Sequence, residues 1–403
     1  MEVGDNLYPD MLALILRFGW NTIAWIGDVT KAFLQLELQH EDRSACKVLW
    51  IKDVGQPLES ELVTLQWNRV TFGISCSPFL LAATIQKHLL KFESDLPVVT
   101  KKIRKDTFVD DWTGGASSVQ EAYELIQQAT TIFADAGMAI GKWETNSQQL
   151  KSLLCPMSND SSETSGALSG TLLGCSKMLG LRWDTSGDFY YFDPKPLLLR
   201  VEPFKDQLTK RGILQVSSKL FDPVGFIAPV IVKVKVLFQE LWRVKGLGWD
   251  SIVPGSVRES WNSFVEDLQH LSLIRVPRYY FQPGQIVNQQ LHVFGDACLT
   301  AYGAVAYMRT TYADGLVVSR ILASKSRVAP VKGLTISRLE LLAALTAARL
   351  GSYLQKALDI KAWPVLMWTD SRVAWHWITG RTERLLPWVR NRVIEICSLF
   401  STS

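Results

Sequence analysis

Thr107-Phe108-Val109-Asp110-Asp111 is a short aromatic and β-branched run that ends in two adjacent acids. We expect Thr107–Val109 to be a strand and the acids to lie at the tip of a hairpin. Two neighbouring carboxylates repel each other, so the pair needs cations or hydrogen bonds as compensation. Carboxylate oxygens are hard ligands that suit Mg²⁺, which usually takes one or two of them together with substrate phosphates.

A third acid, Asp28, directly follows the strand-like run Thr22–Gly27. An acid at the end of a buried strand is costly unless something satisfies it. Two ions about 3.5–4 Å apart can activate a 3′-hydroxyl and neutralise a leaving pyrophosphate. The alternative from these residues alone is that Asp28 caps a helix over 29–36 and that the acid pair forms an ordinary turn.

Three motifs occur in a fixed order: Asp28-Val-Thr-Lys-Ala-Phe33, Phe72-Gly73-Ile-Ser-Cys-Ser77-Pro78 and Phe108-Val109-Asp110-Asp111. In this order they resemble the palm motifs of reverse transcriptases, and the chain is most similar to the Pol polyprotein of BEL/Pao-type LTR retrotransposons. The resemblance extends over almost the whole chain, through Gly137–Trp143, Leu179–Trp183, Ser218–Pro229 and Gln239–Trp242.

The resemblance implies a polymerase site. Asp28 and Asp110 would be the shared metal ligands, with Asp111 beside them, and two Mg²⁺ ions would be held, with Mn²⁺ as a substitute. Lys142 would be the general acid for the leaving pyrophosphate. Without the resemblance, a lone lysine such as Lys142 is more often a solvated surface charge.

The same resemblance implies a binding site for the nucleotide. Phe33 would be the steric gate that leaves no room for a 2′-hydroxyl, although an ordinary core aromatic is the alternative. Phe72 and Gly73 would lie under the incoming nucleotide and the template base, where glycine allows close approach of the backbone. Phe108 replaces the tyrosine of many relatives, which removes a hydroxyl and should leave the metal chemistry intact.

The last part of the chain offers a second set of acids. Asp296 ends a predicted strand, Glu340 lies near the start of a predicted helix over Ile336–Leu358, and Asp370 ends a predicted strand over Val365–Thr369. Apolar neighbours at helical spacing place Glu340 near the buried face. Considered singly, Glu340 could be a first-turn acid favoured by the helix dipole, and Asp370 could cap a helix over 371–378.

Three strands, expected at His292–Gly295, Gly303–Met308 and Leu316–Ala323, precede the helix and the last strand. This order, with the acids Asp, Glu and Asp, resembles the ribonuclease H fold and implies two-metal hydrolysis of an RNA strand. Glu395 is the candidate fourth acid, on a helix after a short strand at Leu386–Val389. It could equally be a solvent-facing helix residue.

The fold class expected is therefore α+β. Residues 1–190 would be a reverse transcriptase palm, an antiparallel sheet with helices, with the fingers largely missing. Residues 191–285 would be a thumb and connection, and 286–403 an α/β ribonuclease H-like domain with a mixed sheet, truncated at its C-terminus. Further expected elements are helices at Pro78–Lys91 and Ser118–Ala136, a surface loop at Ser147–Ser169 and a linker at Pro283–Gln285.

The chain has 403 residues, 47% of them hydrophobic, and a net charge of +4. Residues 200–245 contain nine Lys or Arg and four Asp or Glu, a net charge of +5. We expect this segment to contact a duplex backbone independently of sequence, and Lys101–Lys105 to add a basic stretch, unless both are simply solvated faces. The partners that the resemblance implies are an RNA template, a DNA primer, RNA/DNA hybrid and dNTPs.

Six cysteines lie scattered with no Cys-x-x-Cys spacing, and no apolar run reaches the ~18–20 residues of a membrane helix. The residues therefore favour an intracellular protein with no membrane partner. The resemblance implies a cytoplasmic virus-like particle or the nucleus as its location. Met1–Asp5 carries acids where a secretory signal would carry bases.

Three classes of protein remain as alternatives. The first is a reverse transcriptase and ribonuclease H fragment, with the protease and integrase of the polyprotein outside it and weak polymerase activity because the fingers are missing. The second is a decayed or domesticated nucleic-acid-binding protein without catalysis, which the intact acids argue against. The third is a Pao-type aspartic peptidase region, but Asp184-Thr185-Ser186-Gly187 lacks the glycine that should directly follow the threonine.

Overall fold

The computed structural model describes residues 2–53, 55, 61–155 and 175–400, and it is an α+β protein as predicted. The chain forms two compact units, and the division passes through helix α1 (Met11–Phe18). The first unit comprises Met1–Leu14 and Asn21–Gly170, and the second comprises Ile15–Trp20 and Thr171–Ser403. The predicted boundaries near 190 and 286 stay predictions. Among the described residues, no helix has the length and apolar character needed to cross a membrane.

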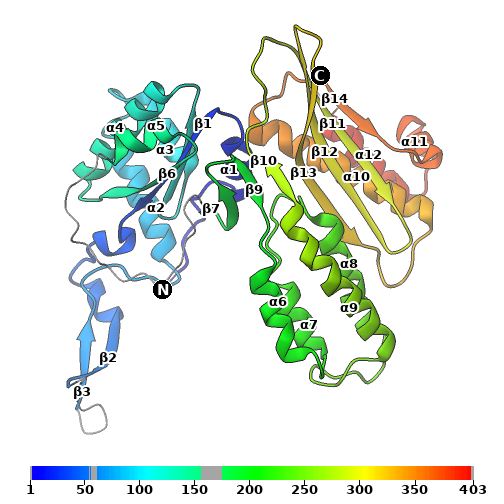
Figure 1. The fold of residues 1–403 in the computed structure, drawn as a ribbon, viewed down its shortest axis with the longest axis horizontal. Coiled ribbons are helices and arrows are strands. Elements are labelled where there is room, and N and C mark those ends of the chain that lie inside the picture. The colour runs from blue at the N-terminus through cyan, green and yellow to red at the C-terminus, as the bar shows by residue number, and fades with distance from the viewer. Residues whose placement is uncertain (1, 54, 56–60, 156–174, 401–403) are drawn as a thin grey trace. The chain divides into compact units, whose positions relative to one another are not determined.

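The first unit is built on an antiparallel sheet with the strand order β4-β5-β1-β6 (Figure 1). Its strands are β1 (Ile23–Val29), β4 (Thr107–Phe108), β5 (Asp111–Ala116) and β6 (Ile140–Thr145). Fully buried Trp25 and Trp112 pack edge to face at the centre of its core. Apolar faces of the surrounding helices complete the core; these are α2 (Ser77–Leu89), α3 (Pro97–Asp106), α4 (Val119–Asp135) and α5 (Gln148–Leu154).

The helices predicted at Pro78–Lys91 and Ser118–Ala136 are confirmed as α2 and α4. The loop predicted over Ser147–Ser169 is wrong at its start, because residues 148–154 form α5. Ser147 caps this helix through its hydroxyl, which accepts a hydrogen bond from the backbone N–H of Leu150. Residues 156–169 of that loop lie outside the described part of the chain.

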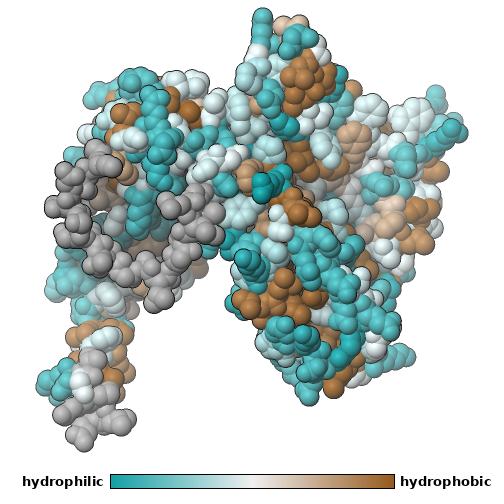
Figure 2. Space-filling model, viewed as in Figure 1, coloured by the Kyte–Doolittle hydropathy of each residue, from teal (hydrophilic) through white to brown (hydrophobic). Residues whose placement is uncertain are grey.

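A two-stranded hairpin, β2 (Lys47–Ile51) and β3 (Leu62–Gln66), extends from the first unit. It lies far from the core, and brown, apolar residues gather on it in the space-filling view (Figure 2). Leu49, Trp50 and Leu62 are each more than half exposed.

The second unit contains an antiparallel sheet of order β10-β9-β8-β7, made of β7 (Cys175–Met178), β8 (Leu181–Asp184), β9 (Phe189–Tyr191) and β10 (Arg275–Pro277). Asp184 accepts hydrogen bonds from the backbone N–H groups of Ser186 and Gly187, so it forms the turn between β8 and β9. This structural role fits the rejection of the peptidase triplet. Four helices share a second core, namely α6 (Lys195–Val201), α7 (Lys210–Ser217), α8 (Ala228–Leu241) and α9 (Gly255–Gln269).

The C-terminal sheet has the order β13-β12-β11-β14. β11 (Ile286–Ala297), β12 (Ala301–Tyr312) and β13 (Val317–Val328) are antiparallel, and β14 (Val365–Trp368) pairs in parallel with β11. The predicted strands are confirmed, although the first three are longer than expected. Helix α10 has the predicted bounds, Ile336–Leu358, and packs on β11 and β12.

Two shorter helices follow, α11 (Arg372–Thr379) and α12 (Pro387–Phe400). The strand predicted at Leu386–Val389 is therefore wrong. Pro387 opens α12, since its fixed φ and missing N–H suit the first helical position. The remaining helical turns are 3₁₀ segments: η1 (Ala32–Gln35), η2 (Asp42–Ala45), η3 (Glu202–Phe204), η4 (His270–Leu273) and η5 (Thr382–Arg384).

Candidate functional site

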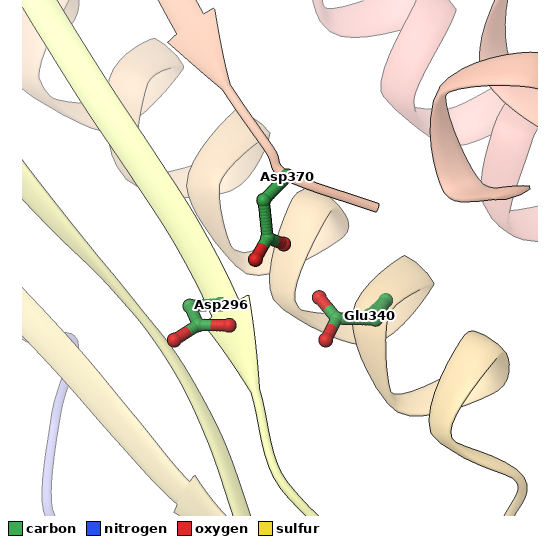
Figure 3. Close-up of side chains that lie close together, drawn as sticks. All are labelled: Asp296, Glu340 and Asp370. Atoms are coloured by element: carbon green, nitrogen blue, oxygen red, sulfur yellow. The ribbon is translucent and has the colours of Figure 1, made fainter. Parts of the chain in front are cut away.

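Three carboxylates of the second unit converge. Asp296, Glu340 and Asp370 each offer an oxygen that lies within 4.8 Å of the other two, and they come from β11, α10 and the segment after β14 (Figure 3). The parallel pairing of Phe294 with Trp368 brings the ends of β11 and β14 side by side, so the two aspartates that follow are neighbours.

Glu340 is the buried member of this group, with 8% of its surface exposed. Its Oε2 atom is buried and has no hydrogen-bond partner. Burial raises the pKa of Glu340 to about 7, and the nearby charges of Asp296 and Asp370 act in the same direction. The predicted position near the buried face is confirmed. The backbone of Ala297 donates a hydrogen bond to this carboxylate and lowers the pKa in part. A buried carboxylate with an unpartnered oxygen is costly, and a bound cation would offset that cost.

Close packing of β11 on α10 brings the acids together. A Cβ added to Gly295 would lie 2.9 Å from the backbone oxygen of Ala343 in α10. A side chain at this position would therefore push the helix away from the strand that carries Asp296.

Two further expectations concern Asp370 as a helix cap and Glu395 as a fourth acid of the site. The N-cap of α11 is Ser371, whose hydroxyl accepts a hydrogen bond from the backbone N–H of Ala374, so the interpretation of Asp370 as that cap is wrong. Glu395 lies outside the group of three. Its Oε1 accepts a hydrogen bond from Nε of Arg349 at 2.6 Å, and this contact lowers the pKa of Glu395.

The acids of the first unit meet across the central pair of strands. Asp28 in β1 lies directly opposite Asp111 in β5, and the turn between β4 and β5 contains Val109 and Asp110. The predicted hairpin tip is confirmed. The alternative, in which Asp28 caps a helix over 29–36, is wrong, because Asp28 lies within strand β1 and only Ala32–Gln35 form a 3₁₀ turn, η1, whose N-cap is Lys31. Val109 has φ 57°, and the carbonyl of Asp110 accepts the N–H of Val29 at 2.8 Å, which ties the tip to β1.

Asp111 is the acid of this group whose charged form is most disfavoured by its surroundings. Burial raises its pKa to about 6, with further increases from Asp110 and Asp28 and a decrease from Lys142. Within the described residues, these three acids do not approach one another as closely as the Asp296 group does.

Lys142 contacts the first of these acids. Its Nζ lies 2.6 Å from Oδ2 of Asp28, although most of the lysine side chain is exposed. The pairing of β1 with β6 shifts register at this point, and Lys142 has φ 50° in the resulting bulge. The bulge redirects the lysine toward the acids, and the contact raises its pKa.

The structure also places the predicted nucleotide-binding residues. Phe33 lies in η1 and is partly buried against the core of the first unit. Phe72 is 76% exposed, and Gly73 has φ 87° with open space where a Cβ would be. The positive φ explains a glycine at this position.

Tyr8 is a neighbour of this site that sequence reasoning missed. Its ring lies 5.6 Å from that of Phe108, and its hydroxyl donates to the carbonyl of Pro78 at 2.8 Å. Burial and the charge of Asp110 raise the pKa of Tyr8 to about 12. No local pattern could have revealed it, because its partners are 70 or more residues away.

The pKa of Asp111 should respond in opposite directions to two substitutions. Asp110→Asn removes a repelling charge and is expected to lower the pKa from about 6, though not to 3.8 because burial remains. Lys142→Met removes an attracting charge and should raise it. Titration of the aspartate carboxyl carbons by NMR without divalent metal checks both signs. A shift of the same sign in both variants would contradict this account of the site.

The fold is similar to that of solved reverse transcriptase structures. It is similar to two solved structures of foamy viral protease-reverse transcriptase, one in complex with RNA/DNA hybrid (TM-score 0.56, 13% identity) and one, named dRH, in complex with double-stranded DNA (TM-score 0.58, 14% identity). Each comparison covers 99% of this chain, which spans only 45% and 58% of the respective viral chains. No curated protein matches the sequence.

Residues 209–371 match the family described as the Pao retrotransposon-like RNaseH-like domain. This range contains Asp296, Glu340 and Asp370. Together with the fold, the match supports a Pol region of a BEL/Pao-type retroelement, as the motifs predict.

Proposed function

We propose that the second unit cleaves the RNA strand of RNA/DNA hybrids, using two Mg²⁺ ions held by Asp296, Glu340 and Asp370. The observation that carries this proposal is the convergence of three carboxylates around a buried, unpartnered oxygen of Glu340. The donor set fits Mg²⁺ because all its atoms are carboxylate oxygens, and Mn²⁺ would be accepted by the same ligands.

The chain's own residues would position the ions and control their binding. When bound, two such ions activate water and neutralise charge on the scissile phosphate. Glu340 must lose its proton to act as a ligand, so its raised pKa of about 7 makes metal binding weaker as the pH falls below neutrality. Glu395 does not belong to this ligand set in the proposal, because Arg349 already pairs with it.

We further propose that Asp28, Asp110 and Asp111 bind metal for RNA-directed DNA synthesis in the Pol protein. The cross-strand pair Asp28–Asp111 and the raised pKa of Asp111 support this, since a cation would relieve their repulsion. Lys142, beside Asp28, would be the proton donor to pyrophosphate.

The remaining residues of the proposed polymerase site concern the nucleotide and the primer. Phe33 would exclude ribonucleotides, and Phe72 with Gly73 would lie against the base pair being formed. The corresponding substrates are dNTPs, an RNA template and a DNA primer.

Two assays run in parallel test both proposals. We expect Asp370→Asn to abolish hybrid cleavage and to leave any primer extension on poly(rA)/oligo(dT) unchanged, and Asp110→Asn to do the reverse. If either variant lost both activities, the proposal that synthesis and cleavage take place at two separate sites would be contradicted. Binding of hybrid with neither activity in the wild-type chain would instead favour a nucleic-acid-binding protein without catalysis.

The basic segment 200–245 is the proposed contact with the duplex backbone. Several of its charges are already engaged: Lys205, Arg211 and Lys233 form ion pairs, and Lys210 is buried beside the carbonyl of Leu247. Fewer cations therefore face a phosphate backbone than the net charge suggests. The affinity for hybrid should fall as salt is added. The logarithm of the binding constant, plotted against the logarithm of the salt concentration, should have a slope of about −0.9 for each phosphate contact.

A further inference from the structure

An aromatic row crosses the C-terminal sheet beside the carboxylate group. The ring of Trp368 in β14 lies parallel to those of His292 and Phe294 in β11, with centroids 5.9 and 5.8 Å away. Tyr307 in β12 extends the row, edge to face with Phe294 at 6.0 Å. Trp368 Nε1 also donates a hydrogen bond to Nδ1 of His292 at 3.1 Å.

The aromatic row (His292, Phe294, Tyr307 and Trp368) lies on the face of the sheet opposite α10. Side chains alternate along β11, and Gly295 is the position that meets α10. His292, Phe294 and Asp296 therefore share the opposite face. Phe294 is 40% and Trp368 48% exposed. Phe294 precedes Asp296 by two residues, and Trp368 precedes Asp370 by two residues. The row therefore lies directly beside the proposed metal centre.

A groove runs beside two members of the row, Phe294 and Tyr307, and reaches Asp296. It has a volume of about 610 Å³, and Phe294, Tyr307 and Asp296 line one side of it. Phe226 and Pro229, at the start of α8, line the other side, and Lys325 of β13 adds a positive charge. The groove thus presents flat apolar faces, one cation and, at Asp296, a ligand for a phosphate-bound metal.

We propose that the aromatic row binds an unpaired nucleotide of the strand whose phosphate reaches Asp296, Glu340 and Asp370. This inference rests on the proposed hydrolysis of hybrids. A nucleobase is the occupant that fits, because base–aromatic stacking is independent of sequence and is worth about 1–3 kcal/mol per base. Bases inside a duplex have both faces covered, so the ligand is a single-stranded extension of the hybrid.

The row is pre-ordered for such stacking. Its rings hold one another through parallel stacking and the Trp368–His292 hydrogen bond, so a base meets a fixed platform and little side-chain freedom is lost on binding. A protein partner at this site would have to cover a face that ends in the metal-binding acids, whereas a nucleotide brings its own phosphate to them.

The test compares binding of hybrids with and without overhangs. We would measure fluorescence anisotropy with uncleavable 2′-O-methyl RNA/DNA hybrids, either blunt or with three unpaired nucleotides at one RNA end, and place 2-aminopurine in the overhang. Of the two overhang hybrids, with the extension at the 5′ or the 3′ end of the RNA, the wild-type chain should bind one about 5- to 50-fold more tightly than the blunt hybrid. Binding of that hybrid should quench the fluorescence of 2-aminopurine. Trp368→Leu should remove most of this preference, and Trp368→Phe should retain it.

Val287→Ala is the matched control, because Val287 is also exposed but lies at the opposite end of β11 from Asp296. It should leave the overhang preference intact. Equal affinity of the wild-type chain for blunt and overhang hybrids would overturn the proposal, as would an equal loss for both hybrids in Trp368→Leu. Failure of the hydrolysis proposal is seen separately, as absent cleavage of an unmodified blunt hybrid.

Discussion

Glu340→Gln is expected to lower the rate of hybrid cleavage by about 100- to 1,000-fold and, without divalent metal, to make the protein more stable at pH 8. The rate falls because a ligand of the ions is lost, at a cost of several kcal/mol in transition-state stabilisation. Stability rises because the neutral amide removes a buried charge that Asp296 and Asp370 repel and that has one oxygen without a hydrogen-bond partner. Cleavage kinetics and urea unfolding in EDTA measure the two effects.

The pH dependence of this stabilisation has a defined sign. The pKa of Glu340 is about 7 in the folded chain against an ordinary value of 4.5, so the folded state keeps a proton that the unfolded state loses. Its contribution to stability is therefore complete below pH 4.5 and is lost as the pH rises through about 7. The advantage of Glu340→Gln should grow over that interval, to ~1–3 kcal/mol.

Glu266→Gln provides the control for charge removal, because Glu266 is an exposed glutamate of α9. It should change neither cleavage nor the pH dependence of stability. A Glu340→Gln protein that is less stable than wild type at pH 8 in EDTA would contradict this account, in which the charged Glu340 carboxylate destabilises the fold when no cation is bound.

Arg278→Met is expected to be the most destabilising single substitution outside the sites, at about 3–5 kcal/mol. Arg278 is fully buried, and its Nε and Nη2 atoms lie 2.6 and 2.7 Å from the two carboxylate oxygens of Asp188. Its Nη1 also donates to the carbonyl of Phe18 at 2.6 Å. Methionine fills similar space but leaves Asp188 without its buried counter-ion. Urea unfolding of the second unit measures the loss.

A double variant separates the charge from the packing. Arg278→Met with Asp188→Asn should be more stable than Arg278→Met alone, because no uncompensated charge is left. Arg211→Met, which breaks the exposed ion pair with Asp250, should leave the unfolding midpoint almost unchanged. Equal changes in the free energy of unfolding for Arg278→Met and Arg211→Met would contradict the expectation that breaking a buried ion pair costs more than breaking an exposed one.

Much of the C-terminal sheet could be predicted from the sequence because its signals are local. The Ala- and Leu-rich run over 336–358 has clear helical spacing, and α10 has those bounds. The apolar run at 365–368 likewise forms β14. Since strand order then brings the ends of β11 and β14 together, Asp296 and Asp370 could be expected to meet.

The features that could not be predicted depend on register or on unusual backbone. Lys142 reaches Asp28 only because a bulge gives it a positive φ. The contact of Trp368 with Phe294 depends on the pairing of strands more than 70 residues apart. Ser371 rather than Asp370 caps α11, a choice between adjacent residues that composition does not decide.

The most direct test of the central claim is cleavage of an RNA/DNA hybrid by the wild-type chain and by Asp370→Asn, in Mg²⁺ and in EDTA. RNA and DNA duplexes of the same sequence serve as alternative substrates. The account predicts Mg²⁺-dependent cleavage of the RNA strand of the hybrid alone, and none by Asp370→Asn. Cleavage that persists in Asp370→Asn or in EDTA, or a wild-type chain that leaves the hybrid intact, would contradict it.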